Sequence, residues 1–356
     1  MKQYKLGHKS LDFPLIQGGM GVGVSLGNLA GHVAKQGCMG VISTVQIGYR
    51  RENFYRDSLN ANREALREEI AKAREIAGGK GMLAINCMVA ANQYNEMLKC
   101  ALEEGIDAII SGAGLPMVMP ELAEGYEVAL APIVSSAKAA RVILQTWQKK
   151  YGRFADFIVL EGRGAGGHLG FKREQIDEEG MSLENLLQEV LKEVRIYEEK
   201  KGAWIPVFVA GSVFDGYELA KYQKLGAFGA QIGTRFIATE ECDASPEFAK
   251  LLCEAGQEDI MILQSPVGLP GRVLSTEFTR KVKEVGRIAP TRCVNCLKTC
   301  DPATTPYCIS EALMQAAQGN REKGLFFSGE NAGRINRIYR VEELIGEIRD
   351  QWEECQ

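Results

Sequence analysis

Short apolar segments alternate with longer amphipathic segments over the first two thirds of the chain. Runs rich in Val, Ile, Leu and Ala are typical of buried parallel strands, and glycine or a small polar residue follows most of them. They predict strands at 13–17, 40–44, 82–87, 108–111, 128–134, 157–161, 206–210 and 230–236. The segments between them have helical composition and predict helices at 26–36, 62–77, 92–104, 116–125, 137–150, 183–200 and 216–225.

This alternation predicts an α/β fold with a parallel sheet, because a crossover helix is needed to start the next strand in the same direction. About eight strand–helix units within 1–240 match a (β/α)8 TIM barrel, which we favour over an open doubly wound sheet. Residues 241–356 exceed what a barrel needs. We expect them to form a mostly helical, cysteine-containing C-terminal extension packed on the barrel, with helices at 246–255, 309–317 and 341–353.

The composition is ordinary for a soluble globular protein, with 46% hydrophobic and 25% charged residues. The formal net charge of -4 gives no indication of a nucleic acid or an anionic membrane as partner. The first residues lack the apolar core of a signal peptide, and no apolar run approaches the roughly 20 residues of a membrane helix. We therefore expect a cytoplasmic protein whose ten cysteines are reduced thiols rather than disulfides.

The segment 157–170 carries the most informative candidate for chemistry. An apolar run ends in glycines, and His168 follows, the only one of three histidines in such a loop. Glycines allow a backbone to approach a ligand closely. Gly162, Gly164 and Gly167 have the spacing of a dinucleotide-binding motif, but no helical pattern begins at the last glycine, so we disfavour that interpretation. The remaining alternatives are a catalytic histidine at a strand end and a mobile glycine loop with a solvated histidine.

A glycine followed by a hydroxyl residue stands at the end of each of the last two predicted strands. These pairs are Gly211-Ser212 and Gly233-Thr234. Barrels often bind a phosphate on these two loops, where bare backbone N–H groups and hydroxyls suit an anion. We expect a phosphate group there. The alternative is that the glycines only turn the chain.

Several distinct short segments, taken in their order along the chain, form a characteristic set, and a loop at Ser265–Arg272 adds to it. The ordered segments are Pro14–Met20, Ile85–Asn86, Ser111–Gly114, Gly166–His168, Ala210–Gly211 and Gln231–Phe236. This set resembles the nitronate monooxygenase family, also called 2-nitropropane dioxygenases, and the related FMN-dependent enoyl-acyl-carrier-protein reductases. The resemblance implies a TIM barrel that binds FMN.

The resemblance also implies roles for individual residues. The flavin ring would lie against the segment at Gly18, Asn86 would hydrogen-bond the flavin or its ribityl chain, and Glu161 stands where the family has a flavin-contacting Gln or Glu. His168 would be the catalytic residue. The whole implied cofactor-binding set is Gly18, Gly19, Met20, Asn86, Glu161, Gly166, Gly167, Gly211, Gln231, Ile232, Gly233 and Thr234.

The implied activity is the oxidation of alkyl nitronates with O2, in which FMN carries the redox step. His168 would act as a base or stabilise negative charge, and an ordinary histidine pKa of about 6.5 suits either role. Two positions depart from the monooxygenase pattern: Gly164 replaces an acid, and Glu161 in place of Gln is closer to the enoyl reductases.

Because of these departures, an FMN-dependent enoyl-thioester reductase that uses NAD(P)H is the alternative activity. A phosphate-ligand-binding barrel without catalysis is a third interpretation. Each activity implies a small-molecule substrate, either a nitronate or an enoyl thioester. A homodimer is one candidate for the oligomeric state.

Four cysteines in the extension have x2, x3 and x7 spacing: Cys293, Cys296, Cys300 and Cys308. Such a set could bind zinc or an iron–sulfur cluster. The first spacings are similar to the cluster segment of some barrel enoate reductases of a different family. The alternative is a group of buried or surface thiols in an irregular cap.

Overall fold

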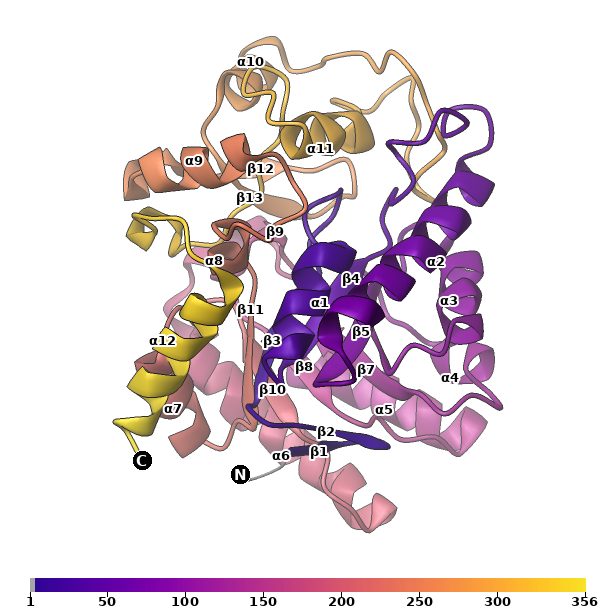
Figure 1. The fold of residues 1–356 in the computed structure, drawn as a ribbon, viewed down its shortest axis with the longest axis vertical. Helices are drawn as coiled ribbons and strands as arrows, with labels where there is room; N and C mark the ends of the chain where they lie inside the picture. Colours follow the sequence, from indigo (N-terminus) through magenta and orange to yellow (C-terminus); the bar gives the residue numbers. More distant parts are fainter. Residues whose placement is uncertain (1–3) are drawn as a thin grey trace.

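The computed structural model describes residues 4–356, apart from the side chain of Glu179. Eight parallel strands close into a barrel in the order β10, β11, β3, β4, β5, β6, β7, β8, with helices around it (Figure 1). This confirms the predicted (β/α)8 barrel. The barrel strands are β3 (Leu15–Gln17), β4 (Met39–Ser43), β5 (Met82–Met88), β6 (Ala108–Gly112), β7 (Ala129–Val134), β8 (Ile158–Glu161), β10 (Val207–Ala210) and β11 (Gly229–Ile232).

The surrounding helices begin and end where local chemistry favours it. Asp57, Ser136, Ser182 and Asp215 accept backbone N–H bonds at the starts of four of them. The left-handed Gly152 ends one helix, and other glycines end two more in the same way. The helices are α1 (Gly27–Lys35), α2 (Ser58–Ala77), α3 (Tyr94–Glu103), α4 (Met119–Leu122), α5 (Ala137–Tyr151), α6 (Leu183–Lys201), α7 (Gly216–Lys224) and α8 (Thr234–Ile237).

Two predicted elements differ from the structure. The strand predicted at 230–236 ends at Ile232, because Gly233 has a helical backbone conformation and α8 begins at Thr234. The buried Arg235 supports α8, since its guanidinium donates to the Phe214 carbonyl and to the carboxylate of Glu347. The helix predicted at 116–125 is shorter in the structure, where only α4 is helical, and α4 has a proline in its first turn.

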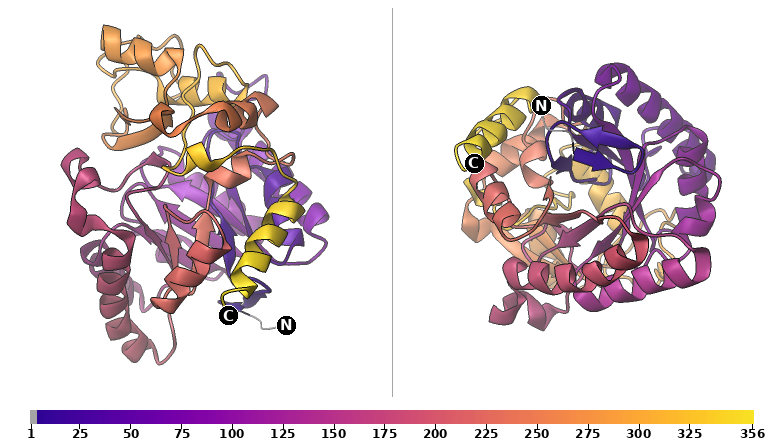
Figure 2. Two further views of the ribbon diagram at one scale, coloured as in Figure 1. Left: turned by 90° about the vertical axis from the view of Figure 1, so that its left-hand side faces the viewer. Right: turned by 90° about the horizontal axis from the view of Figure 1, so that it is seen from below.

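The amino end of the barrel is closed by packed side chains and by an N-terminal hairpin. This hairpin consists of β1 (Tyr4–Leu6) and β2 (Lys9–Leu11) and covers the barrel in the view from below (Figure 2). The ring of Phe228 packs edge-on against the rings of Tyr4 and Phe208, with centroid distances of 5.4 and 5.1 Å. The carboxyl ends of the strands are therefore left to form a site, as in other barrels of this type.

The C-terminal region lies over those carboxyl ends (Figures 1 and 2). It contains α9 (Pro246–Glu254), β12 (Ile260–Gln264), β13 (Pro270–Leu274), α10 (Glu277–Val285) and α11 (Ile309–Ala317). Strand β13 pairs with β12 and with the two-residue strand β9 (Gly167–His168). The last helix, α12 (Val341–Glu353), returns to the barrel and packs against α7 and α1. The division of the chain near residue 240 stays a prediction.

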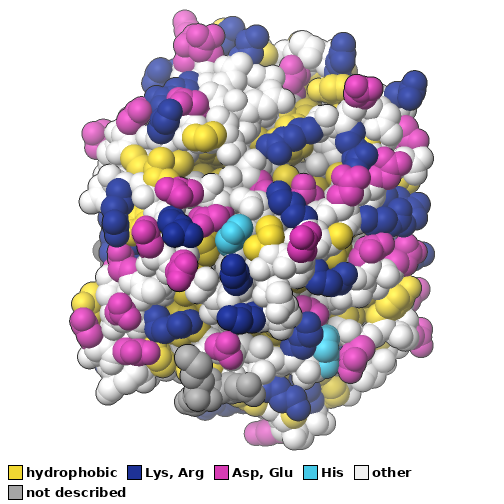
Figure 3. Space-filling model, in the orientation of Figure 1, with side chains coloured by type: hydrophobic (Ala, Val, Ile, Leu, Met, Phe, Trp, Pro, Cys, Tyr) yellow, Lys and Arg dark blue, Asp and Glu magenta, His cyan; other side chains and the backbone are white. Residues whose placement is uncertain are grey.

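Charged side chains of both signs are interspersed on the face shown in Figure 3. Over residues 4–356, no helix combines the length and apolar character needed to span a bilayer.

Candidate active site

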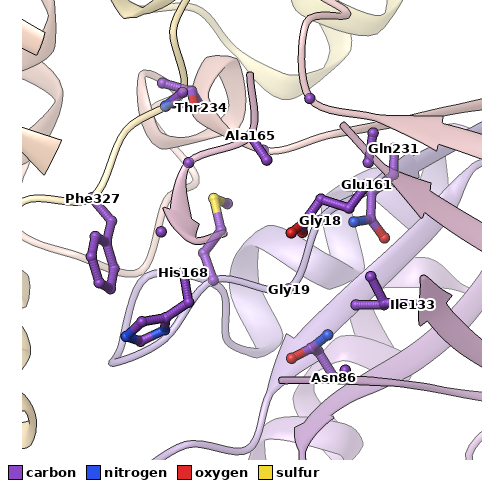
Figure 4. A pocket seen from close by; sticks show the side chains of 18 of the residues that line it. Gly18, Gly19, Asn86, Ile133, Glu161, Ala165, His168, Gln231, Thr234 and Phe327 are labelled. Carbon is purple, nitrogen blue, oxygen red and sulfur yellow. Dashed lines mark hydrogen bonds between the residues drawn. The ribbon is translucent and has the colours of Figure 1, made fainter. Parts of the chain in front are cut away.

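A cavity of about 420 Å³ lies at the carboxyl ends of the barrel strands, beneath the C-terminal region (Figure 4). His168 and every residue of the cofactor-binding set predicted above line it, although these residues come from widely separated parts of the chain. The individual roles assigned to them stay predictions.

One wall of the cavity is bare backbone from the segment after β3. The Gly18 N–H donates to the Ile232 carbonyl at 2.8 Å, and the Gly18 carbonyl accepts from the Gln17 side chain. The side-chain Oε1 of Gln17 in turn accepts from the Val41 N–H at 3.0 Å. A Cβ at Gly19 would stand 2.3 Å from the Cβ of Asn86, so this position requires glycine. The wall is thus fixed by hydrogen bonds and carries no side chain at Gly18 and Gly19.

Two polar side chains of the cavity lining, those of Glu161 and Gln231, have no side-chain hydrogen-bond partner among the described residues. Glu161 and Gln231 both pair in register with Ala210, so they stand two strands apart at the same level. The buried Oε1 of Gln231 has no hydrogen-bond partner among the described residues. Burial raises the pKa of Glu161 to about 8, so its carboxyl group is protonated at pH 7. Buried polar groups without partners are costly, and a polar ligand would satisfy them.

His168 lies in a strand rather than in the predicted loop, because it pairs with Gly271 of β13. Its Nε2 is 2.7 Å from the Ser265 hydroxyl oxygen. Its ring packs edge-on against the ring of Phe327, with the two ring centroids 5.0 Å apart. Burial lowers the pKa of His168 to about 4, well below the ordinary value expected from the sequence. The imidazole is therefore neutral at pH 7.

Five residues of the cavity lining come from the two predicted phosphate loops and from the loop before His168, and their backbone N–H groups form a set. Two of these residues, Gly211 and Ser212, have positive φ angles of 74° and 68°. Within the described residues, these N–H groups donate no backbone hydrogen bond. Backbone N–H groups without an acceptor favour an anion. We call this set the N–H cluster; its members are Gly166, Gly211, Ser212, Gly233 and Thr234.

The glycine loop before His168 approaches the protein's own C-terminal segment. A Cβ at Gly166 would lie 2.6 Å from the carbonyl carbon of Ser328, and one at Gly164 would overlap the Glu330 carboxylate. The buried Arg272 fixes the loop by donating to the carbonyls of Arg163 and Ala165 at 2.6 and 2.9 Å. At Gly166 the neighbouring backbone leaves no room for a side chain, and at Gly164 the neighbouring side chains would have to move. Contact of these glycines with a ligand stays a prediction.

Apolar side chains of the C-terminal region form part of the cavity lining. We call this surface the roof; its side chains come from the C-terminal region and are Phe248, Leu269, Leu313, Leu325 and Phe327. The position of the C-terminal extension follows from these side chains. These contacts place it over the mouth.

Comparison with known proteins identifies the family. The sequence model of one family, described as nitronate monooxygenase, matches residues 2–351. The chain belongs to the nitronate monooxygenase family. This confirms the resemblance drawn from short segments and makes the protein an oxidoreductase.

Relatives of this family member are named for different activities. It is 26% identical to a nitronate monooxygenase of Paraburkholderia phytofirmans, over 71% of this chain and 62% of that protein. It is 25% identical to a hydroxy-methyl-oxo-octahydroindene-carboxyl-CoA dehydrogenase of Mycobacterium tuberculosis, over 95% and 92% of the two chains. Its structure is similar to FabK from Thermotoga maritima, with a TM-score of 0.73, 25% identity and coverage of 97% and 94%.

The four clustered cysteines lie outside the main cavity of this nitronate monooxygenase family member. They line a separate cavity of about 20 Å³ and are free thiols. No three His, Cys, Asp or Glu side chains within residues 4–356 are arranged to hold a metal ion. The structure therefore gives the predicted site at Cys293, Cys296, Cys300 and Cys308 no support, and metal binding there stays a prediction.

Proposed function

We propose that this protein is an FMN-dependent nitronate monooxygenase that oxidises alkyl nitronates with O2. The observation that carries the proposal is one cavity combining an unpaired N–H cluster, unpaired amide and carboxyl groups, and a half-buried neutral imidazole. Membership of the nitronate monooxygenase family supports the same activity.

The residues present fit FMN. The N–H cluster would hold the phosphate, and the absence of side chains at Gly18 and Gly19 leaves space for a planar ring. Asn86, Glu161 and the unpaired Gln231 amide offer hydrogen bonds to the polar atoms of the flavin or its ribityl chain. Bound FMN would supply the redox chemistry, accepting electrons from the substrate and returning them to oxygen.

His168 then has a defined task. With a pKa of about 4 it is a weak base at neutral pH and is poorly suited to removing a carbon-bound proton. As a neutral ring whose Nε2 is engaged with Ser265, it can still donate or accept one hydrogen bond. This favours a substrate that is already deprotonated, such as a nitronate, whose negative charge a ring N–H would stabilise.

A second activity, reduction of enoyl thioesters with NAD(P)H, also has supporting observations. The apolar roof suits a substrate with a hydrocarbon tail, and the protonated Glu161 could donate a proton. The similarity to the structure of FabK supports this alternative as well. So does the M. tuberculosis relative, which is named as a dehydrogenase of a carboxyl-CoA substrate.

Anaerobic mixing separates the two activities. The purified protein, loaded with FMN, is mixed with an alkyl nitronate and, separately, with NADPH, and the flavin absorbance is followed. We expect the nitronate to bleach the flavin and to cause oxygen uptake in air. Rapid bleaching by NADPH with no response to several nitronates would reject the proposal in favour of the reductase.

A further inference from the structure

One buried hydroxyl group in the cavity has no partner and was not assigned by sequence analysis. Ser328 is 1% exposed and lines the cavity, and its Oγ makes no hydrogen bond within the described residues. Ser328 lies nearly 100 residues beyond the predicted phosphate loops. A buried hydroxyl normally has a partner, so this one requires an explanation.

The backbone of this segment is fixed beside the N–H cluster. The Ser328 N–H donates to the Arg272 carbonyl at 3.3 Å, and the Gly329 N–H donates to the Thr234 hydroxyl at 2.8 Å. The next residue, Glu330, donates its N–H to the Gly164 carbonyl at 3.0 Å. Ser328 therefore approaches the N–H cluster through ordered contacts on both of its sides, and its position follows from the fold.

Two other hydroxyls near the N–H cluster already have a hydrogen-bond partner. The Ser212 hydroxyl donates to the Glu330 carboxylate, and the Thr234 oxygen accepts from Gly329. The sequence predicts that these two hydroxyls help to bind a phosphate group. Ser328, in contrast, keeps both its donor and its acceptor capacity.

We propose that Ser328 is a cofactor-binding residue whose hydroxyl donates to the phosphate of FMN, so that the C-terminal segment completes the phosphate site. This inference rests on the FMN binding proposed above. It explains why Gly166 must lack a side chain, since the close approach of residue 328 would otherwise be blocked. It also makes phosphate affinity depend on the C-terminal region as well as on the barrel.

The test compares FMN with riboflavin, which lacks the phosphate. Apoprotein is titrated with each flavin, and quenching of flavin fluorescence gives the Kd. Ser328→Ala should weaken FMN binding about tenfold, the usual effect of losing a hydrogen bond to a charged group, and leave riboflavin binding unchanged. The control Ser310→Ala removes an equally buried serine hydroxyl that does not line the cavity, and both affinities should stay at wild-type values.

Thermal unfolding of the apoprotein gives an independent measurement. Because the Ser328 hydroxyl has no partner, its removal should leave the Tm of the apoprotein the same or higher. Unchanged FMN affinity, equal weakening of FMN and riboflavin binding, or a lower Tm would each overturn the role of Ser328. If wild-type apoprotein binds FMN no more tightly than riboflavin, the phosphate site itself is wrong, and the proposed function loses its main support.

Discussion

Glu161 provides a quantitative test of how the cavity is built. Its carboxyl group ends β8 inside the cavity, and burial raises its pKa from 4.5 to about 8. Between these values the folded protein binds one proton more than the unfolded chain does. The free energy of unfolding must therefore fall as pH rises through this window, by about 1.4 kcal/mol for each pH unit.

The predicted effect of Glu161→Gln follows from this difference. Glutamine has nearly the same shape and does not titrate, so the variant should lose this component of the pH dependence. Between pH 5 and pH 8 the stability of the variant relative to wild type should rise by up to about 4 kcal/mol. Because the family pattern allows Gln at this position, FMN binding should survive the substitution.

Urea unfolding of the two apoproteins at several pH values measures the effect. Glu199→Gln, which changes an exposed carboxylate on α6, is the matched control and should follow the wild-type curve. Parallel stability curves for wild type and Glu161→Gln across this range would refute the reasoning, because they would mean that the Glu161 carboxyl titrates normally in the folded protein.

Three further predictions concern other parts of the molecule. His168→Ala should keep FMN but lose turnover of nitronates about 100-fold or more, because the negative charge would lose a hydrogen-bond donor, and oxygen uptake measures this loss. Gly19→Ala should cost about 1–3 kcal/mol of stability and weaken FMN binding, because its Cβ would overlap Asn86, as unfolding and flavin titration can measure. If the cysteines from Cys293 to Cys308 bind a metal, elemental analysis of anaerobically purified protein should find zinc or iron in stoichiometric amount, and Cys300→Ser should abolish it.

Each of these predictions has a clear contrary result. Full turnover in flavin-loaded His168→Ala would remove the histidine from catalysis. Wild-type stability and flavin affinity in Gly19→Ala would mean that this wall of the cavity is flexible. Metal-free protein with freely titratable thiols would reject the cysteine site. Cys355→Ser, outside the cysteine segment, is the control that should leave any metal content unchanged.

The barrel could be predicted from sequence because its buried parallel strands are continuous apolar runs that end in glycines. The carboxyl ends of such strands converge, so residues as distant as Gly18, Asn86 and Thr234 were expected to meet, and they line one cavity. The family resemblance rested on the same strand ends.

Features that depend on the C-terminal region could not be predicted in this way. The pairing of β9 with β13 moves His168 from a loop into a strand and brings Ser265, 97 residues away, to its ring. The low pKa of the histidine results from burial, and the roof contributes to that burial through Phe327. Ser328 carried no sequence signal, because its role depends on which neighbouring hydroxyls are already engaged.

The central claim is that the cavity binds FMN by its phosphate. The most direct measurement is the flavin content of the purified protein: the absorption spectrum is recorded, the chromophore is released with acid, and its identity and amount per chain are determined. We predict about one FMN per chain, or full reconstitution of colourless apoprotein by FMN. A protein that stays colourless after incubation with excess FMN would contradict the account.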